Sequence, residues 1–178
     1  METLASAVGV TKAALYYHFD SKDTLVLAVA RRALEQDRRD VQTVIDSAPT
    51  PITQLQALLH AFSQASTRPH QHLHLAIRDA SRFLPSAHQS ELHQRLRAGV
   101  PQQLQQLLQS GVEQRQFEPH NTYWMTAVLG TVLGDLAARP PGTVSEEELA
   151  QLMNFVMRGL GAHTRTPSSS GPTSLNSA

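Results

Sequence analysis

The motif at residues 4–22 constrains the fold most, because it reads as two short helices joined by a tight turn. Leu4 and Val8 recur at helical spacing, and Gly9 then ends the pattern as a helix C-cap would. Thr11 is a favourable N-cap for the helix that follows. Two short helices connected through a glycine-containing turn form a helix-turn-helix, so the sequence predicts one here.

The second of these helices has side chains that suit DNA. Small and polar residues at its N-terminus can enter a major groove roughly 12 Å wide without a clash. The tyrosines and the histidine that follow can reach phosphates or base edges, and a lysine opens the next helix, where a phosphate would also meet free N–H groups. The predicted DNA-binding residues are Thr11, Lys12, Ala13, Tyr16, Tyr17, His18 and Lys22.

Residues 10–19, followed by Ser21 and Lys22, closely resemble the DNA-binding signature of the TetR (tetracycline repressor) family. That signature runs Gly-Val, Ser or Thr, three variable residues, Leu-Tyr-x-His-Phe, one variable residue, Ser or Asn, and Lys, and nearly every defining position is filled. The close match covers about the first thirty residues. The remainder resembles the family only as a succession of helices.

Members of that family carry a further helix ahead of the position that matches Met1, and its apolar face covers residues matching Leu4, Leu15 and Phe19. A misassigned start codon, a trimmed chain and a true loss of the helix each explain why this sequence opens after it. Isolated helices shorter than about 12–15 residues are marginal in water. In each case we expect a loosened or displaced DNA-binding segment.

Composition narrows the class of protein. Long Leu-, Ala- and Gln-rich stretches favour an all-α fold. The 15 basic and 15 acidic residues cancel, so DNA binding must rest on a local patch. The absence of cysteine excludes disulfides and thiolate catalysis. The most apolar segment, residues 123–138, is too short to span a bilayer. We therefore expect a cytoplasmic protein that does not bind membranes.

We expect an incomplete N-terminal helix-turn-helix followed by a helical ligand-binding and dimerisation domain. Residues 1–40 are assigned to the DNA-binding domain with its linker helix, 41–162 to the C-terminal domain, and 163–178 to a disordered tail. The linker helix is predicted to run from Ser21, which with Asp20 supplies its turn and N-cap, to about Asp46. Its inward residues are predicted to be Leu25, Ala28 and Val29, and its i,i+4 ion pair to be Arg31 with Glu35.

Further helices are predicted over residues 51–66, 70–83, 86–114, 122–138 and 146–160. Thr50 and Pro51 start the first of them as N-cap and first helical residue. Pro101 is expected to interrupt the third, because proline removes an intrahelical hydrogen bond. Ser145 and Glu148 form a capping box for the last.

The helix over 122–138 is apolar nearly all round, so we expect it to be buried on two sides. One of its stripes consists of small residues, which allow close approach of another backbone. The resemblance implies that the last two helices form a homodimer interface, as half of a four-helix bundle. Tight packing within one subunit is the alternative. The predicted interface residues are Ala127, Gly130, Gly134, Ala138, Leu152, Met153, Val156 and Leu160.

The family resemblance also implies a small-molecule pocket among the helices of the C-terminal domain, apolar with a few polar groups. Plain core packing is the alternative for each residue. The predicted lining residues are Phe62, His74, Ile77, Arg78, Phe83, Leu104, Leu108, Trp124 and Val128.

No enzyme motif appears, and we expect no enzymatic activity, no catalytic residue and no cofactor. His70, His72 and His74 form a short run, but zinc usually needs three or four convergent ligands, so no metal is expected. Asp135 stands alone in an apolar helix and is expected at an edge or hydrogen-bonded, with contact to a ligand or to the dimer axis as the other option.

The sequence thus predicts a TetR-like transcriptional regulator, a repressor released from its operator by a small-molecule effector. Its expected partners are double-stranded operator DNA, a second copy of the chain and an effector of unknown identity. The alternative is a dimeric small-molecule-binding module that has lost DNA binding.

Overall fold

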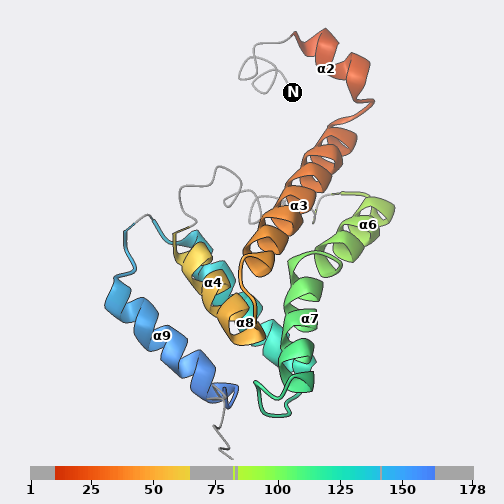
Figure 1. Ribbon diagram of the computed structural model, residues 1–178. Helices are drawn as coiled ribbons and strands as arrows, with labels where there is room; N and C mark the ends of the chain where they lie inside the picture. Colours follow the sequence, from red (N-terminus) through yellow and green to blue (C-terminus); the bar gives the residue numbers. More distant parts are fainter. Residues whose placement is uncertain (1–10, 65–81, 83, 141, 163–178) are drawn as a thin grey trace, which may run out of the picture.

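The computed structural model describes residues 11–64, 82, 84–140 and 142–162, and all regular elements in these ranges are helices. The all-α prediction is confirmed (Figure 1). The helices are α2 Lys12–His18, α3 Lys22–Asp46, α4 Pro51–Ser63, α6 Ser86–Arg97, α7 Val100–Glu113, α8 Thr122–Ala138 and α9 Glu146–Gly159.

Side chains next to the helices fix where they begin. The Thr11 hydroxyl oxygen accepts the Ala14 N–H at 3.1 Å, which confirms the predicted cap of α2. The Ser21 hydroxyl oxygen accepts the Thr24 N–H at 3.1 Å and so caps α3. Equivalent caps at Thr50, Asn121 and Ser145 begin α4, α8 and α9. Four of these caps were predicted; that of Asn121 was not.

The predicted interruption at Gly99, Val100 and Pro101 is also confirmed. α6 ends at Arg97 and α7 begins at Val100. Pro101 stands in the first turn of α7, where the missing N–H removes no intrahelical hydrogen bond. One long apolar pattern therefore becomes two helices that point in different directions (Figure 1).

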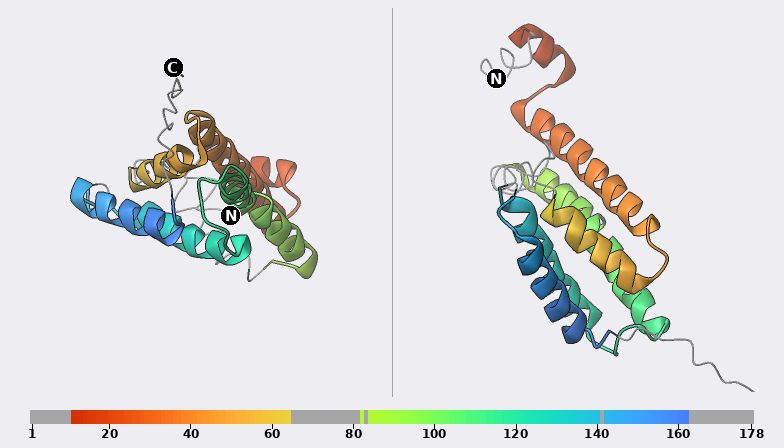
Figure 2. Two further views of the ribbon diagram at one scale, coloured as in Figure 1. Left: turned by 60° about the horizontal axis from the view of Figure 1, so that its bottom comes forward. Right: turned by 60° about the vertical axis from the view of Figure 1, so that its left-hand side comes forward.

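α4 is the central helix of the bundle, since it packs against α3, α7, α8 and α9. α3 is the longest of the described helices, and it contacts α4, α6 and α7. α2 stands beyond the N-terminal end of α3, away from the bundle, in Figure 1 and in the right-hand view of Figure 2. α8 and α9 each pack against α4.

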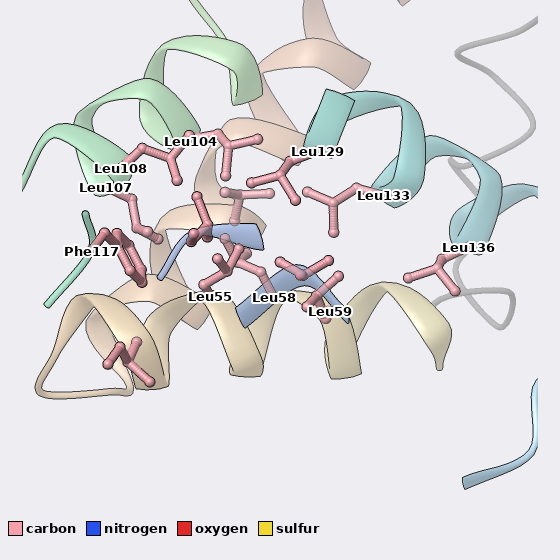
Figure 3. Packing of buried hydrophobic residues seen from close by; sticks show 14 residues of the cluster. Leu55, Leu58, Leu59, Leu104, Leu107, Leu108, Phe117, Leu129, Leu133 and Leu136 are labelled. Carbon is pink, nitrogen blue, oxygen red and sulfur yellow. The ribbon is translucent and has the colours of Figure 1, made fainter. Parts of the chain in front are cut away.

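The main core is a cluster of buried residues contributed by α3, α4, α7, α8 and α9. Leucines of α4 interdigitate with leucines of α7 and α8, and Phe117 closes one end (Figure 3). Burying a leucine side chain contributes about 1.5–3 kcal/mol, so this cluster dominates the stability of the described chain. Val41 is the buried residue that α3 contributes to this cluster.

A second, smaller cluster joins α3 to α6. It consists of Leu27, Ala30, Ala33 and Leu34 from α3, Leu92 from α6, and Leu84 from the segment before α6. The two alanines bring the helices close but remove little apolar surface from water. The N-terminal half of α3 is therefore held by α6 and not by the main core.

Two expectations for α3 were wrong. Val29 is 42% exposed, so it does not face inward beside Leu25. Arg31 pairs across helices with Glu91 of α6 rather than with Glu35, which instead pairs with Arg38 and Arg39. Spacing along one helix could not show that Glu91 would come within reach.

The expected burial of α8 on two sides is wrong for the single chain. Leu129, Leu133 and Leu136 are buried, but Trp124 and Val128 are exposed on the other side. A Cβ added at Gly130 or Gly134 would meet no atom within 4 Å, so these two glycines do not pack tightly against any described residue of the same subunit. The intrasubunit alternative for the small-residue stripe is thereby excluded for the described residues.

The helix predicted over 70–83, the tail over 163–178 and the helix before Gly9 fall outside the described residues. Within the described part of the chain, no helix is both long enough and apolar enough to cross a bilayer.

Candidate nucleic-acid interface

α2 presents its polar residues to solvent. Thr11 and Ala13 are exposed at its N-terminal end, and Tyr16, Tyr17 and His18 are exposed toward its C-terminal end. Tyr17 is 86% exposed, and its ring meets that of His18 edge to face, with centroids 5.2 Å apart. At a DNA surface, the Tyr17 hydroxyl and the His18 imidazole can donate or accept hydrogen bonds, and the two exposed rings can stack.

The start of α3 lies directly after α2. Ser21 caps α3 with its hydroxyl, and Lys22 follows as an exposed residue of the first turn. The first N–H groups of a helix carry a partial positive charge, which adds to that of the ammonium group. The structure thus places six of the seven predicted DNA-binding side chains on an exposed N-terminal segment. The side chain of Lys12, the seventh, is outside the described set.

The predicted lining residues of the effector pocket do not come together as one group. Leu104 and Leu108 are buried in the main core, and Phe62 packs against that core while partly buried. Trp124 and Val128 are exposed on the outer side of α8. His74, Ile77, Arg78 and Phe83 are outside the described residues. Trp124 and Val128 therefore face away from the leucines with which they were grouped.

The predicted dimer residues divide in a similar way. Ala127, Gly130, Gly134 and Ala138 are all exposed on α8, and Leu152 and Met153 of α9 are half-buried. Val156 and Leu160 are buried in the main core of the single chain, so their assignment to the interface is corrected. The i,i+4 spacing of Leu152, Val156 and Leu160 identified a stripe of α9 but not the partner on which it packs.

Two exposed aromatic residues were missed by the sequence analysis. Phe155 of α9 is 76% exposed, and Tyr123 of α8 is exposed beside Trp124, with ring centroids 5.3 Å apart. Phe155 carried a signal, because its large ring interrupts the polar side of α9. Tyr123 did not stand out, since α8 is apolar nearly all round. With Trp124 and Val128 they are the large, exposed side chains of α8 and α9, which we call the outer aromatic face.

Ion pairs on α3 and α6 hold two glutamates in the charged form. Hydrogen bonds from Arg31 and Arg95 lower the pKa of Glu91 from its ordinary value of 4.5 to about 2. Arg38 and Arg39 lower the pKa of Glu35 by the same kind of contact. Only the first of these carboxylates joins two helices.

Gln103 is the one buried polar residue among the described side chains, with 7% of its surface exposed. Its amide nitrogen donates to the Arg38 carbonyl oxygen and to Gln42 Oε1, both at 2.9 Å. A buried amide without these acceptors would carry a desolvation penalty. Gln103 therefore fixes the C-terminal half of α3 on α7.

The sequence singled out a histidine run and one acidic residue as candidate metal or ligand contacts. In the described ranges, no three His, Asp or Glu side chains gather where they could bind a metal ion. The run of His70, His72 and His74 is outside these ranges. Asp135 is exposed and forms an ion pair with Arg139 at 2.8 Å, as expected of a residue at an edge.

Two family profiles match the chain. One, described as bacterial regulatory proteins of the tetR family, matches residues 1–29. The other, described as a tetracyclin repressor-like C-terminal domain, matches residues 48–160 and so covers more than half of the chain. A search of curated protein sequences finds no match.

Solved structures share the fold. A bacterial regulatory protein in the tetR family from Rhodococcus RHA1 has a TM-score of 0.72 at 15% identity, over 92% of this chain and 86% of that one. PfmR, a TetR family transcriptional regulator from Thermus thermophilus, has a TM-score of 0.70 at 22% identity, over 89% of this chain and 87% of that one.

A third structure, of AibR in complex with isovaleryl coenzyme A and operator DNA, has a TM-score of 0.68 at 19% identity, over 91% of this chain and 87% of that one. The likeness to these structures shows a common fold, and the profile matches cover both ends of it. This chain therefore belongs to the TetR family of transcriptional regulators, with an N-terminal DNA-binding segment and a helical C-terminal domain.

Proposed function

We propose that this chain is a dimeric repressor that places α2 of each subunit in successive major grooves of an operator and leaves the DNA when a small molecule binds its C-terminal domain. The observation that carries this proposal is the exposed α2, whose outward side chains are Thr11, Ala13, Tyr16, Tyr17 and His18. Groove centres one helical turn apart are about 34–36 Å from each other, which sets the spacing of the two helices.

The domain division follows the two clusters of buried residues. Leu27, Ala30 and Leu34 belong to the α3–α6 cluster, and Val41 is the first residue of α3 in the main core. We place the boundary between DNA-binding and effector domains near residue 40, within α3. A continuous helix across this boundary is a stiff connection, through which a change in one domain reorients the other.

The outer aromatic face supports the dimer. Soluble monomers rarely expose large contiguous apolar patches. Trp124, Val128 and Phe155 supply large apolar surface, and Gly130 and Gly134 leave room for a partner's backbone. A second copy that meets this face would complete the burial of α8 that its sequence predicts.

The effector is proposed to be a small organic molecule that binds between α4, α7 and α8. Phe62, Leu104 and Leu108 are apolar groups on the α4 and α7 sides of that region. The structure of AibR, which is similar in fold, is a complex with isovaleryl coenzyme A and operator DNA, and this supports the proposal. Effector binding would release DNA through a difference in affinity between two states of the protein.

The test is selection of duplexes from random-sequence DNA, followed by fluorescence anisotropy across a salt series. We expect specific binding that weakens with salt. Lys22→Ala should lower the salt slope by about 1 for each phosphate that the lysine no longer neutralises. Arg97→Ala, which removes an exposed positive charge from α6, serves as the matched control and should leave the slope unchanged.

A wild-type chain that binds no selected duplex above its non-specific level would contradict the repressor proposal. The dimeric small-molecule-binding module would then be the better description of this protein.

A further inference from the structure

One carboxylate connects α3 to α6. Glu91 accepts from Arg31 Nε at 2.7 Å and from Arg31 Nη2 at 2.6 Å, a two-pronged contact between the helices. It also accepts from Arg95 Nε at 2.8 Å, one turn further along α6. Of the ion pairs seen among the described residues, this is the one that links two different helices.

The position of this contact along α3 gives it a role. It lies beside the small α3–α6 cluster, where Ala30 and Ala33 contribute little burial. Further along α3, Gln103 and the main core hold the helix on α7. Among the described contacts, those with α6 hold the N-terminal half of α3. A tilt of α3 about its anchored C-terminal half would break these contacts and would carry α2 with it.

Glu91 can release Arg31 without becoming unpaired. If α6 moves from α3, the carboxylate keeps Arg95, a neighbour on its own helix. The arrangement with the α3–α6 contact and the one without it then differ by a single exposed ion pair. One such pair shifts the equilibrium between them by up to about fivefold. Two such pairs in a symmetric dimer would multiply to about 25-fold. Such a contact can bias the orientation of α3 without preventing its change.

We propose that Glu91 is a positioning residue for DNA binding, which holds the N-terminal half of α3 through Arg31 in the orientation that presents α2, and which keeps Arg95 alone when α3 is released. This inference rests on the proposed repressor function. It adds the contact that sets the orientation of the DNA-binding segment.

The first experiment compares Glu91→Gln with Glu35→Gln. Each wild-type glutamate is paired with two arginines, and each substitution raises the net charge by one. Of these pairs, only that of Glu91 with Arg31 crosses between helices. We expect Glu91→Gln to weaken binding of the selected duplex relative to Glu35→Gln, by up to about 25-fold in a dimer.

A second pair of variants tests the predicted exchange of partners. Arg95→Ala leaves the Arg31–Glu91 contact but removes the partner of the released state, so DNA affinity should equal or exceed that of Arg39→Ala. Arg39→Ala also removes an i,i+4 partner of a glutamate, within α3. If Glu91 had only a structural role, Arg95→Ala and Glu91→Gln would both lower the affinity for DNA.

A third measurement does not involve DNA. The chain has no cysteine, so spin labels can be attached at Lys22→Cys and Gln105→Cys, both exposed, to report the tilt of α3 relative to α7. We expect Glu91→Gln to broaden or shift the distance distribution, and Glu35→Gln to leave it unchanged.

Identical distances and affinities for Glu91→Gln and Glu35→Gln would overturn the inference, as would weaker binding by Arg95→Ala than by Arg39→Ala. If the wild-type chain binds no duplex but Glu91→Gln still shifts the distances, the repressor function fails and the control of α3 by Glu91 stands.

Discussion

The N-terminal half of α3 packs on α6 through a cluster of six buried residues, two of them alanines, whereas the C-terminal half reaches a core of fourteen that includes ten leucines. The described chain thus holds one helix firmly at one end and lightly at the other. Elements with few buried apolar contacts open at lower free energy than the core does. The lightly held end is the one that leads to α2, where a regulator needs movement.

The largest expected effect tests this contrast directly. Leu55→Ala removes a fully buried leucine from the main core and should lower the free energy of unfolding by about 2–5 kcal/mol. Leu92→Ala removes an equally buried leucine from the α3–α6 cluster. It should cost less, since α6 can settle toward α3. Denaturant unfolding measures both.

Amide hydrogen exchange shows which helices lose protection in Leu55→Ala and in Leu92→Ala. Leu92→Ala should deprotect α6 and the N-terminal half of α3 while α4 and α8 stay protected. Equal costs, or deprotection of the whole chain by Leu92→Ala, would show that α3 is held equally along its length.

An intermediate effect is expected at the end of the molecule opposite α2. Trp124→Glu places a charge on the outer aromatic face and should weaken dimerisation by about 2 kcal/mol or more, roughly 30-fold. Sedimentation velocity over a concentration series measures it. Gln105→Glu, an exposed charge added to α7, is the control and should leave the dimer intact. If Trp124→Glu dimerises as strongly as the wild type, the outer aromatic face is not the dimer interface.

The smallest effect concerns the pH dependence of the α3–α6 contact. The pKa of Glu91 is lowered from 4.5 to about 2, so its ionised form is favoured by folding. The stability that it contributes is present above pH 4.5 and is lost as the pH falls toward 2. The difference in Tm between wild type and Glu91→Gln should therefore shrink across this window. Glu147→Gln, on α9, is the control; a gap that persists at the acid end of the window would contradict the assignment.

Features that depend on a few consecutive residues were predictable. The caps at Thr11, Ser21 and Ser145 join atoms three residues apart, and the break before Pro101 follows from its missing N–H. Each was therefore determined by local sequence, as were the helical class of the fold and the exposed character of α2. Asn121 was missed, although the same rule applies to it.

Features that depend on which helices meet were decided by the tertiary structure. Arg31 pairs with Glu91 and not with Glu35, Val156 turns into the core while Phe155 turns out, and α8 buries only one of its two apolar sides. Helical periodicity identifies the faces of a helix, but it does not say which face a particular neighbour will cover. That choice depends on the angles and positions at which helices distant in sequence pack, and only the folded chain sets them.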